Sequence, residues 1–231
     1  MSSPAVPDII TIVGTSYFQP IADLIERMLK RPAGADNTTR SGHFENGYAA
    51  ATAVLLVATL ESFVSRVRFL RSGDVVSGKD VPDQLLHFFP DLPNHKELAE
   101  VFLMRNIVVH NHVWHLDVSA VEERGVATIA SPKDLKFQTK KNYDAIVDVG
   151  TRKTVLLGLS ASPTSVDRYD VGAVFRVIWT TLQFMNEKNF SHTPLAGQTV
   201  HFWAICALSS DAVSNPLPSE GERWVGVRRL G

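Results

Sequence analysis

The run MRNIVVHNHVWH brings together side chains that can transfer protons and bind anions. It contains Arg105, Asn106, His110, His112 and His115 within one short stretch. An imidazole titrates near neutral pH and can donate or accept a proton. A guanidinium stays charged and can hold an anion through parallel hydrogen bonds. These residue types predict a site for acid–base or anion-binding chemistry.

The position of Arg105 is more informative than its type. Apolar residues recur at helical spacing from Leu98 to Val109, and Arg105 takes a place in that apolar row. Because an unpaired buried guanidinium is costly, Arg105 must face a partner, a cleft or an interface. Asn106 and His110 lie four apart and share a helix face. Arg105 and His110 are rotated by roughly 140°, so they meet only through the arginine's length, a helix end or a second subunit.

Two proline-free segments should form the helices that position these residues. The first runs from His43 to about Arg71, is apolar nearly all round in its first half, and has Gly73 just beyond it as a C-terminal cap. The second runs from about His95 to Val113, with Asn94 as its N-terminal cap. We expect the first helix to be buried centrally.

Weaker patterns predict the remaining elements. Helices are expected over about 17–30, 167–187 (capped by Thr164 or Ser165) and 199–208, with a helical turn or two near 84–89. Two β-branched runs in VSAVEERGVATIA predict a hairpin after Trp114, whereas 133–162 supports no assignment.

These elements predict a mainly α protein with one domain over residues 1–231. Its core should comprise about 17–113 and 164–209, with a mixed β and loop insertion over 114–163 and an exposed tail over 210–231.

The composition is that of an ordinary soluble protein. The formal charge of −1, from 23 Lys and Arg against 24 Asp and Glu, leaves no global basic field, so any RNA contact needs a local patch. The lone Cys206 excludes an intramolecular disulfide and a cysteine zinc cluster. The start lacks a secretory pattern, and the apolar stretch from Ala49 to Leu60 is shorter than the ~20 residues of a membrane span. We expect a cytoplasmic protein without membrane contact.

The run RNIVVH resembles the RNA-cleaving motif of the HEPN family, which has an arginine, a polar residue, three further residues and a histidine. The upstream run LLVATLESFVSRVRFL is also similar to the long helix of such domains, so the resemblance covers roughly 48–113. It implies an antiparallel helical bundle with a small β insertion or hairpin after the motif helix. It also implies homodimers in which two motifs face each other, and cleavage with no metal or cofactor.

The resemblance further implies a role for each residue of the motif. His110 would act as general base on a ribose 2′-hydroxyl or as acid to the leaving 5′-oxygen, and Arg105 would hold the scissile phosphate. Asn106 would orient the histidine or the phosphate. The products of cleavage would be a 2′,3′-cyclic phosphate and a 5′-hydroxyl. Supporting roles fall to Glu61, His112 and Asn111. The expected partner is single-stranded RNA. A toxin or antiviral-defence effector of this kind would also have an antitoxin or regulatory protein partner.

Four other interpretations stay open. Arg105 and His110 could be a satisfied polar pair between packed helices. The domain could be HEPN-like but inactive, serving as a dimerisation or partner-binding module. His110, His112 and His115 could bind a metal, although the aspartate typical of such histidine runs is missing. Glu61 could simply be the first polar residue where the long helix leaves the core.

Overall fold

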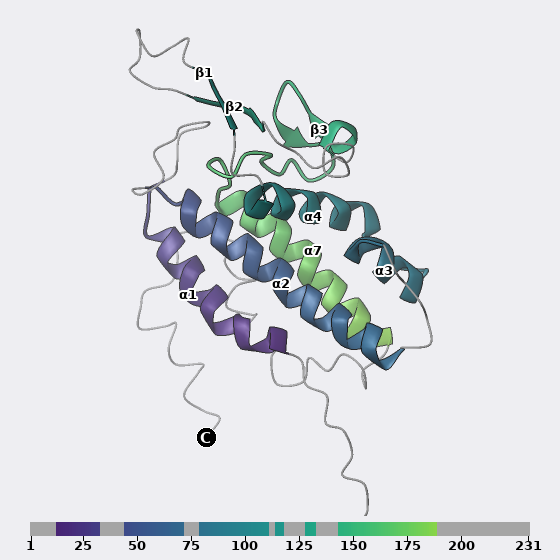
Figure 1. Ribbon diagram of the computed structural model, residues 1–231. Coiled ribbons are helices and arrows are strands. Elements are labelled where there is room, and N and C mark those ends of the chain that lie inside the picture. Colours follow the sequence, from purple (N-terminus) through teal and green to yellow (C-terminus); the bar gives the residue numbers. More distant parts are fainter. Residues whose placement is uncertain are drawn as a thin grey trace, which may run out of the picture.

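The computed structural model describes residues 13–32, 44–71, 79–110, 114–117, 128–132 and 143–188. Most of these residues are helical, and short antiparallel strands follow the motif helix (Figure 1), which confirms the mainly α prediction. The elements are η1 (Val13–Tyr17), α1 (Phe18–Leu29), α2 (Asn46–Leu70), α3 (Val81–Phe88), α4 (His95–His110), β1 (Trp114–Asp117), β2 (Thr128–Pro132), β3 (Val147–Asp148), β4 (Lys153–Thr154) and α7 (Arg168–Lys188).

Helix α2 lies at the centre of the fold, as its apolar sequence predicts. It contacts η1, α1, α3, α4 and α7, and a broad side of it is buried, whereas Val54 and Leu55 are only partly buried. Helix α1 runs antiparallel to α2, since Arg31 beyond the C-terminal end of α1 stacks over Tyr48 in the first turn of α2.

By length and composition, α2 alone among the described helices could also cross a membrane, but core helices of soluble proteins meet the same criterion. Here half of its most apolar stretch is buried inside the protein.

Helices α2 and α7 run parallel, so the expected antiparallel arrangement holds for α1 and α2 but not for this pair. Their N-terminal ends meet at the buried Glu45, whose Oε2 accepts from Arg168 Nε at 2.7 Å. Asn46 Nδ2 also donates to the Val166 carbonyl at 3.0 Å. The buried side chains of Glu45 and Asn46 therefore join two segments far apart in the sequence.

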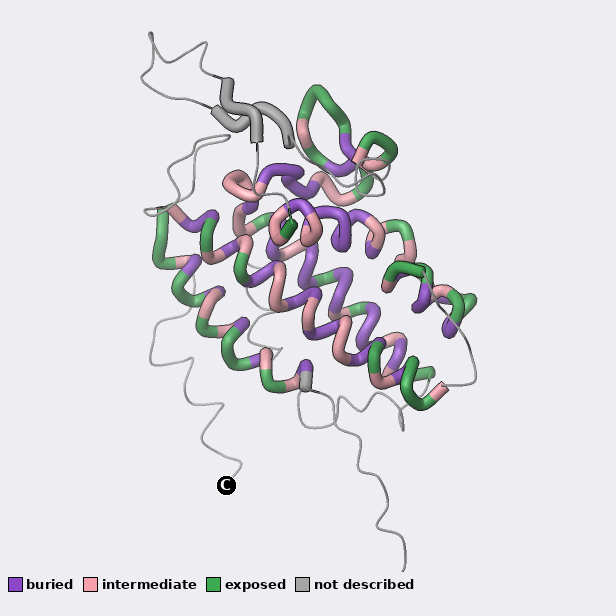
Figure 2. The backbone as a smooth tube through the Cα atoms, viewed as in Figure 1, coloured by how far each residue is buried: buried purple, intermediate pink, exposed green. Residues whose placement is uncertain are grey.

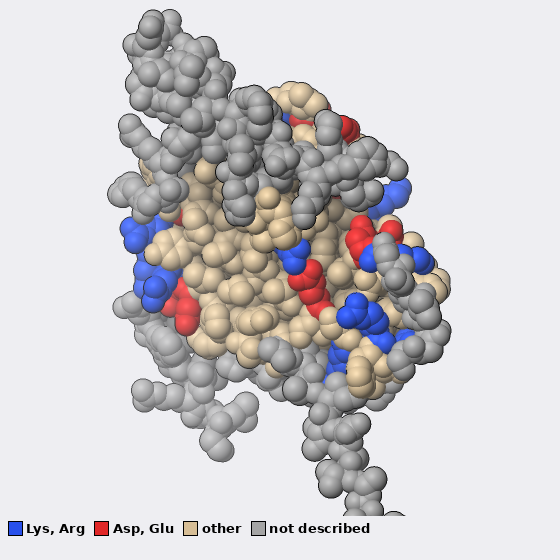
Figure 3. Space-filling view, in the orientation of Figure 1, with Lys and Arg blue, Asp and Glu red and all other residues tan. Residues whose placement is uncertain are grey.

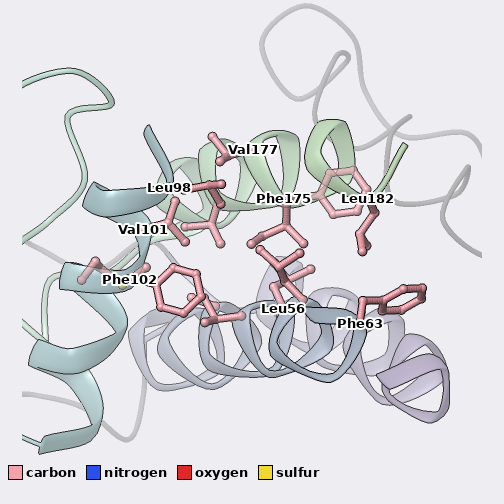
Figure 4. Packing of buried hydrophobic residues seen from close by; sticks show 14 of the residues in the cluster. Leu56, Phe63, Leu98, Val101, Phe102, Phe175, Val177 and Leu182 are labelled. Atoms are coloured by element: carbon pink, nitrogen blue, oxygen red, sulfur yellow. The ribbon is translucent and has the colours of Figure 1, made fainter. Parts of the chain in front are cut away.

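The main core lies where α4 packs across α2 and α7. Figure 4 shows Leu98, Val101 and Phe102 of α4 approaching side chains from both other helices. The buried faces of α2, α4 and α7 turn toward one another, whereas exposed residues follow the outer side of α1 (Figure 2). Burial of aliphatic and aromatic side chains at this crossing supplies the main drive for folding.

Helix α4 is buried on two opposite sides. Its outer side carries Leu103 and Ile107, which form a second apolar cluster with Val147 and Ala161 from the segment around β3 and β4. This segment covers the part of the sequence for which no structure was predicted. Strands β3 and β4 pair over only two residues each, too short for an alternating pattern to be recognisable.

The helix ends agree with prediction better than the caps do. Asn94, expected to cap α4, instead donates to the Val177 carbonyl and to Thr181 Oγ1 of α7, and its Oδ1 has no partner among the described residues. The cap of α7 is Asp167, whose Oδ1 accepts from the amides of Tyr169 and Asp170, and not Thr164 or Ser165. Both predictions were wrong because a cap depends on the local backbone path as well as on residue type.

The predicted hairpin after the motif helix is present as antiparallel pairing of β1 with β2, but its first strand is the run WHLD, which precedes the predicted run VSAV. Residues 118–127, which include that run, lie outside the described residues. The Glu-Arg-Gly turn, Gly73, Cys206, the helix expected over 199–208 and the tail over 210–231 lie outside the described residues. So do residues 111–113, the expected end of the motif helix.

Candidate functional site

Arg105 of α4 meets Glu61 of α2 at the crossing of the two helices. Its Nη2 lies 2.9 Å from both carboxylate oxygens of Glu61. The arginine side chain is 22% exposed and that of Glu61 is 29% exposed, so both groups reach solvent. The expectation that Arg105 faces a partner is therefore met, and Glu61 is that partner.

Asn106 fixes the second edge of the same guanidinium. Its Oδ1 accepts from Arg105 Nη1 at 3.0 Å, between neighbouring residues on α4. An arginine has five N–H donors, and these contacts use its two terminal nitrogens from two directions. The guanidinium is thus held in one orientation at the edge of the core. In this structure Asn106 contacts the arginine, and the role toward the histidine or the phosphate that the resemblance implies stays a prediction.

His110 lies at the last position of α4 and is exposed. Since α4 is helical from His95 through His110, the ideal rotation of roughly 140° from Arg105 applies. Arg105 points to α2, and His110 projects from another side of the helix. Among the described residues none hydrogen-bonds the His110 ring, so the structure does not join Arg105 and His110 into a pair within one chain.

The other predicted site residues cannot be placed. Asn111 and His112 lie outside the described residues, and for His115 only the backbone, within β1, is described. The described part of the chain contains no group of three His, Cys, Asp or Glu side chains that could hold a metal ion. His112 lies outside that part and the side chain of His115 is not described, so the metal interpretation stays a hypothesis.

Glu100, which the sequence analysis did not identify, holds the outer side of α4 in place. Glu100 of α4 is 2% exposed, and its carboxylate accepts from the amides of Leu156 at 2.7 Å and Leu157 at 2.8 Å. These bonds tie the segment after β4 onto α4, one turn before Arg105. An acidic residue between Leu98 and Val101 in an apolar row was a visible signal of a buried anchor.

The surface around the Arg105–Glu61 contact carries little charge. Figure 3 shows a broad face over α2 and its neighbours made mainly of uncharged residues, with Lys, Arg, Asp and Glu largely at its margins. Apolar residues that are partly exposed on α2 and α4 include Val54, Leu55, Val108 and Val109. Arg105, which is partly exposed, therefore lies in a weakly charged part of the surface.

No protein-family model, no curated protein and no solved structure matches the chain.

Proposed function

We propose that the protein is a metal-independent endoribonuclease of the HEPN type that cleaves single-stranded RNA. The observation that carries the proposal is the guanidinium of Arg105, held partly exposed by Glu61 and Asn106 on the helix that ends at the exposed His110. A preoriented guanidinium can bind a phosphate without first paying for its own ordering. An exposed imidazole at a helix end can reach a proton on the substrate.

The chemistry would be transfer of the phosphate to the neighbouring ribose oxygen. A base removes the proton of the 2′-hydroxyl, the 2′-oxygen attacks phosphorus, and the bond to the 5′-oxygen breaks as an acid protonates it. Arg105 would stabilise the charge that builds on the phosphoryl oxygens in the transition state. The products are a 2′,3′-cyclic phosphate and a 5′-hydroxyl.

The placement of Arg105 and His110 on different sides of α4 favours a site shared by two copies of the chain. The reaction needs both a base and an acid, and two copies would supply two imidazoles. The weakly charged face over α2 and α4 is compatible with such pairing, since interface centres are depleted of charged residues (Figure 3). In a dimer, His110 of one copy would lie across the cleft from Arg105 of the other.

The test is cleavage of a mixed single-stranded RNA in EDTA by the wild type and by Arg105→Ala and His110→Ala. Exposed residues elsewhere, Arg176 and His87, give matched controls when changed to alanine. We expect loss of at least ~100-fold in rate for the site variants, in line with removal of a proton-transfer or charge-stabilising group, and no change for the controls. Equal activity of all four variants would contradict the assignment.

One observation favours a second candidate function, an inactive dimerisation or partner-binding module. The guanidinium of Arg105 is already satisfied by Glu61 and Asn106, as a structural ion pair would be. A dimer that is folded but cleaves no RNA, and that dissociates when Val108 on the weakly charged face is changed to glutamate, would support this candidate instead.

A further inference from the structure

The exposed side of α2 continues past Glu61 toward the C-terminal end of the helix. Glu61, Ser65 and Arg68 lie at i, i+4 and i+7, so they follow one another along one face. Seven residues of helix span about 10 Å, which places Arg68 two turns beyond the Arg105–Glu61 contact. Ser65 and Arg68 are both exposed.

An exposed aromatic side chain follows this arginine as the next residue of α2. Phe69 is 62% exposed, whereas Phe63, two turns earlier on α2, is fully buried. Arg68 has no ion-pair partner among the described residues. Figure 3 also shows Lys and Arg side chains gathered near the end of α2. Nearby, Arg71 is used in packing, since it stacks over Phe88 and Phe89 and donates to the Phe88 carbonyl at 2.8 Å.

From this arrangement we infer that Arg68 and Phe69 form a contact surface for single-stranded nucleic acid, occupied by nucleotides that flank the phosphate at Arg105. An exposed arginine neutralises a backbone phosphate, and an exposed ring stacks on a base without regard to sequence. Because the chain has no global basic field, RNA binding needs local positive charge, and Arg68 supplies it here. The inference rests on the proposed function, because the phosphate bound at Arg105 determines where the flanking nucleotides of the RNA lie.

The test measures binding separately from cleavage. A fluorescein-labelled 2′-O-methyl RNA of about 12 nucleotides cannot form the cyclic phosphate, so its anisotropy reports binding alone. The variants are Arg68→Gln and Phe69→Ala, and the matched controls are Arg176→Gln and Tyr169→Ala. The control residues are an exposed arginine and a 66% exposed tyrosine on α7, away from the face that carries Glu61.

We expect Phe69→Ala to weaken binding about fivefold or more and Arg68→Gln to lower the slope of log K against log salt by about 0.7. The α7 variants should bind like the wild type. Wild-type binding by both test variants, or no binding by the wild type, would overturn the inference. Unchanged cleavage of natural RNA by Arg68→Gln and Phe69→Ala would overturn it and leave the nuclease intact. Binding that depends on both residues without any cleavage would support the surface and refute the nuclease.

Discussion

Replacing Glu100 by glutamine should destabilise the fold strongly, although the two side chains have nearly the same shape and volume. The carboxylate accepts two backbone amides, from Leu156 and Leu157, at 2.7 and 2.8 Å, and is almost fully buried. Glutamine keeps one acceptor oxygen but turns an NH2 group toward the other amide, so that two donors face each other.

The magnitude follows from the bonds that are lost. A hydrogen bond to a charged group contributes roughly 1.5–3 kcal/mol, and the remaining bond loses about half its strength when its acceptor becomes neutral. Together these changes should lower the free energy of unfolding by about 3 kcal/mol. For a chain of this size that corresponds to a fall in Tm of roughly 6–12 °C.

The assay is urea and thermal unfolding of Glu100→Gln beside Glu187→Gln, which changes an exposed glutamate at the end of α7. The control should stay within about 0.5 kcal/mol of the wild type. If Glu100→Gln were as stable as Glu187→Gln, the carboxylate would not be the anchor of the segment after β4.

Three further substitutions test the packing and the electrostatics. Gly14→Ala should cost about 1–3 kcal/mol in unfolding experiments, because its Cβ would lie 2.8 Å from the Thr59 carbonyl oxygen. The added Cβ of Gly172→Ala on α7 meets nothing within 4 Å, so this change should stabilise the protein by about 0.5–1 kcal/mol. Loss of stability in both glycine variants, or in neither, would contradict the described packing at these positions. Burial, and then the nearby Asp167, raise the pKa of Asp170 from 3.8 to about 6, so the folded protein binds this proton more tightly than the unfolded chain. Its contribution to stability is therefore present below about pH 4 and is lost as pH rises to 6. Denaturation at pH 4.5 and 6.5 should show most of this loss, about 2 kcal/mol, in the wild type relative to Asp170→Asn, and equal pH dependence in both would refute it.

Periodicity predicted the helices because each buries a stripe that repeats along the chain. The bounds of α2 and α4 fall within a few residues of those expected, and the place of Arg105 in an apolar row correctly indicated that it needs a partner. The direction of α7 was not predictable in this way. A helix presents the same stripe whether it packs parallel or antiparallel, and the contacts that decide, Glu45 with Arg168, involve side chains 123 residues apart.

The candidate site was predictable only in part. That Glu61 is the partner of Arg105 could not be read from the sequence, because it depends on the height at which α4 crosses α2. The partners of Glu100 are backbone amides, which carry no residue-type signal. The pairing of Arg105 with His110 stays a prediction, since the structure of a single chain places them on different sides of one helix.

The parallel pairing of α2 with α7 has a consequence for how the protein is made. Synthesis completes α2 long before α7, so about a hundred residues are added while one apolar side of α2 has no covering helix. Contacts between distant segments require a costly loop closure, and they form late in folding. Until then, α2, which is apolar enough to cross a membrane, exposes this side to solvent. The nascent chain is therefore expected to bind holdase chaperones through α2 until α7 emerges and displaces them.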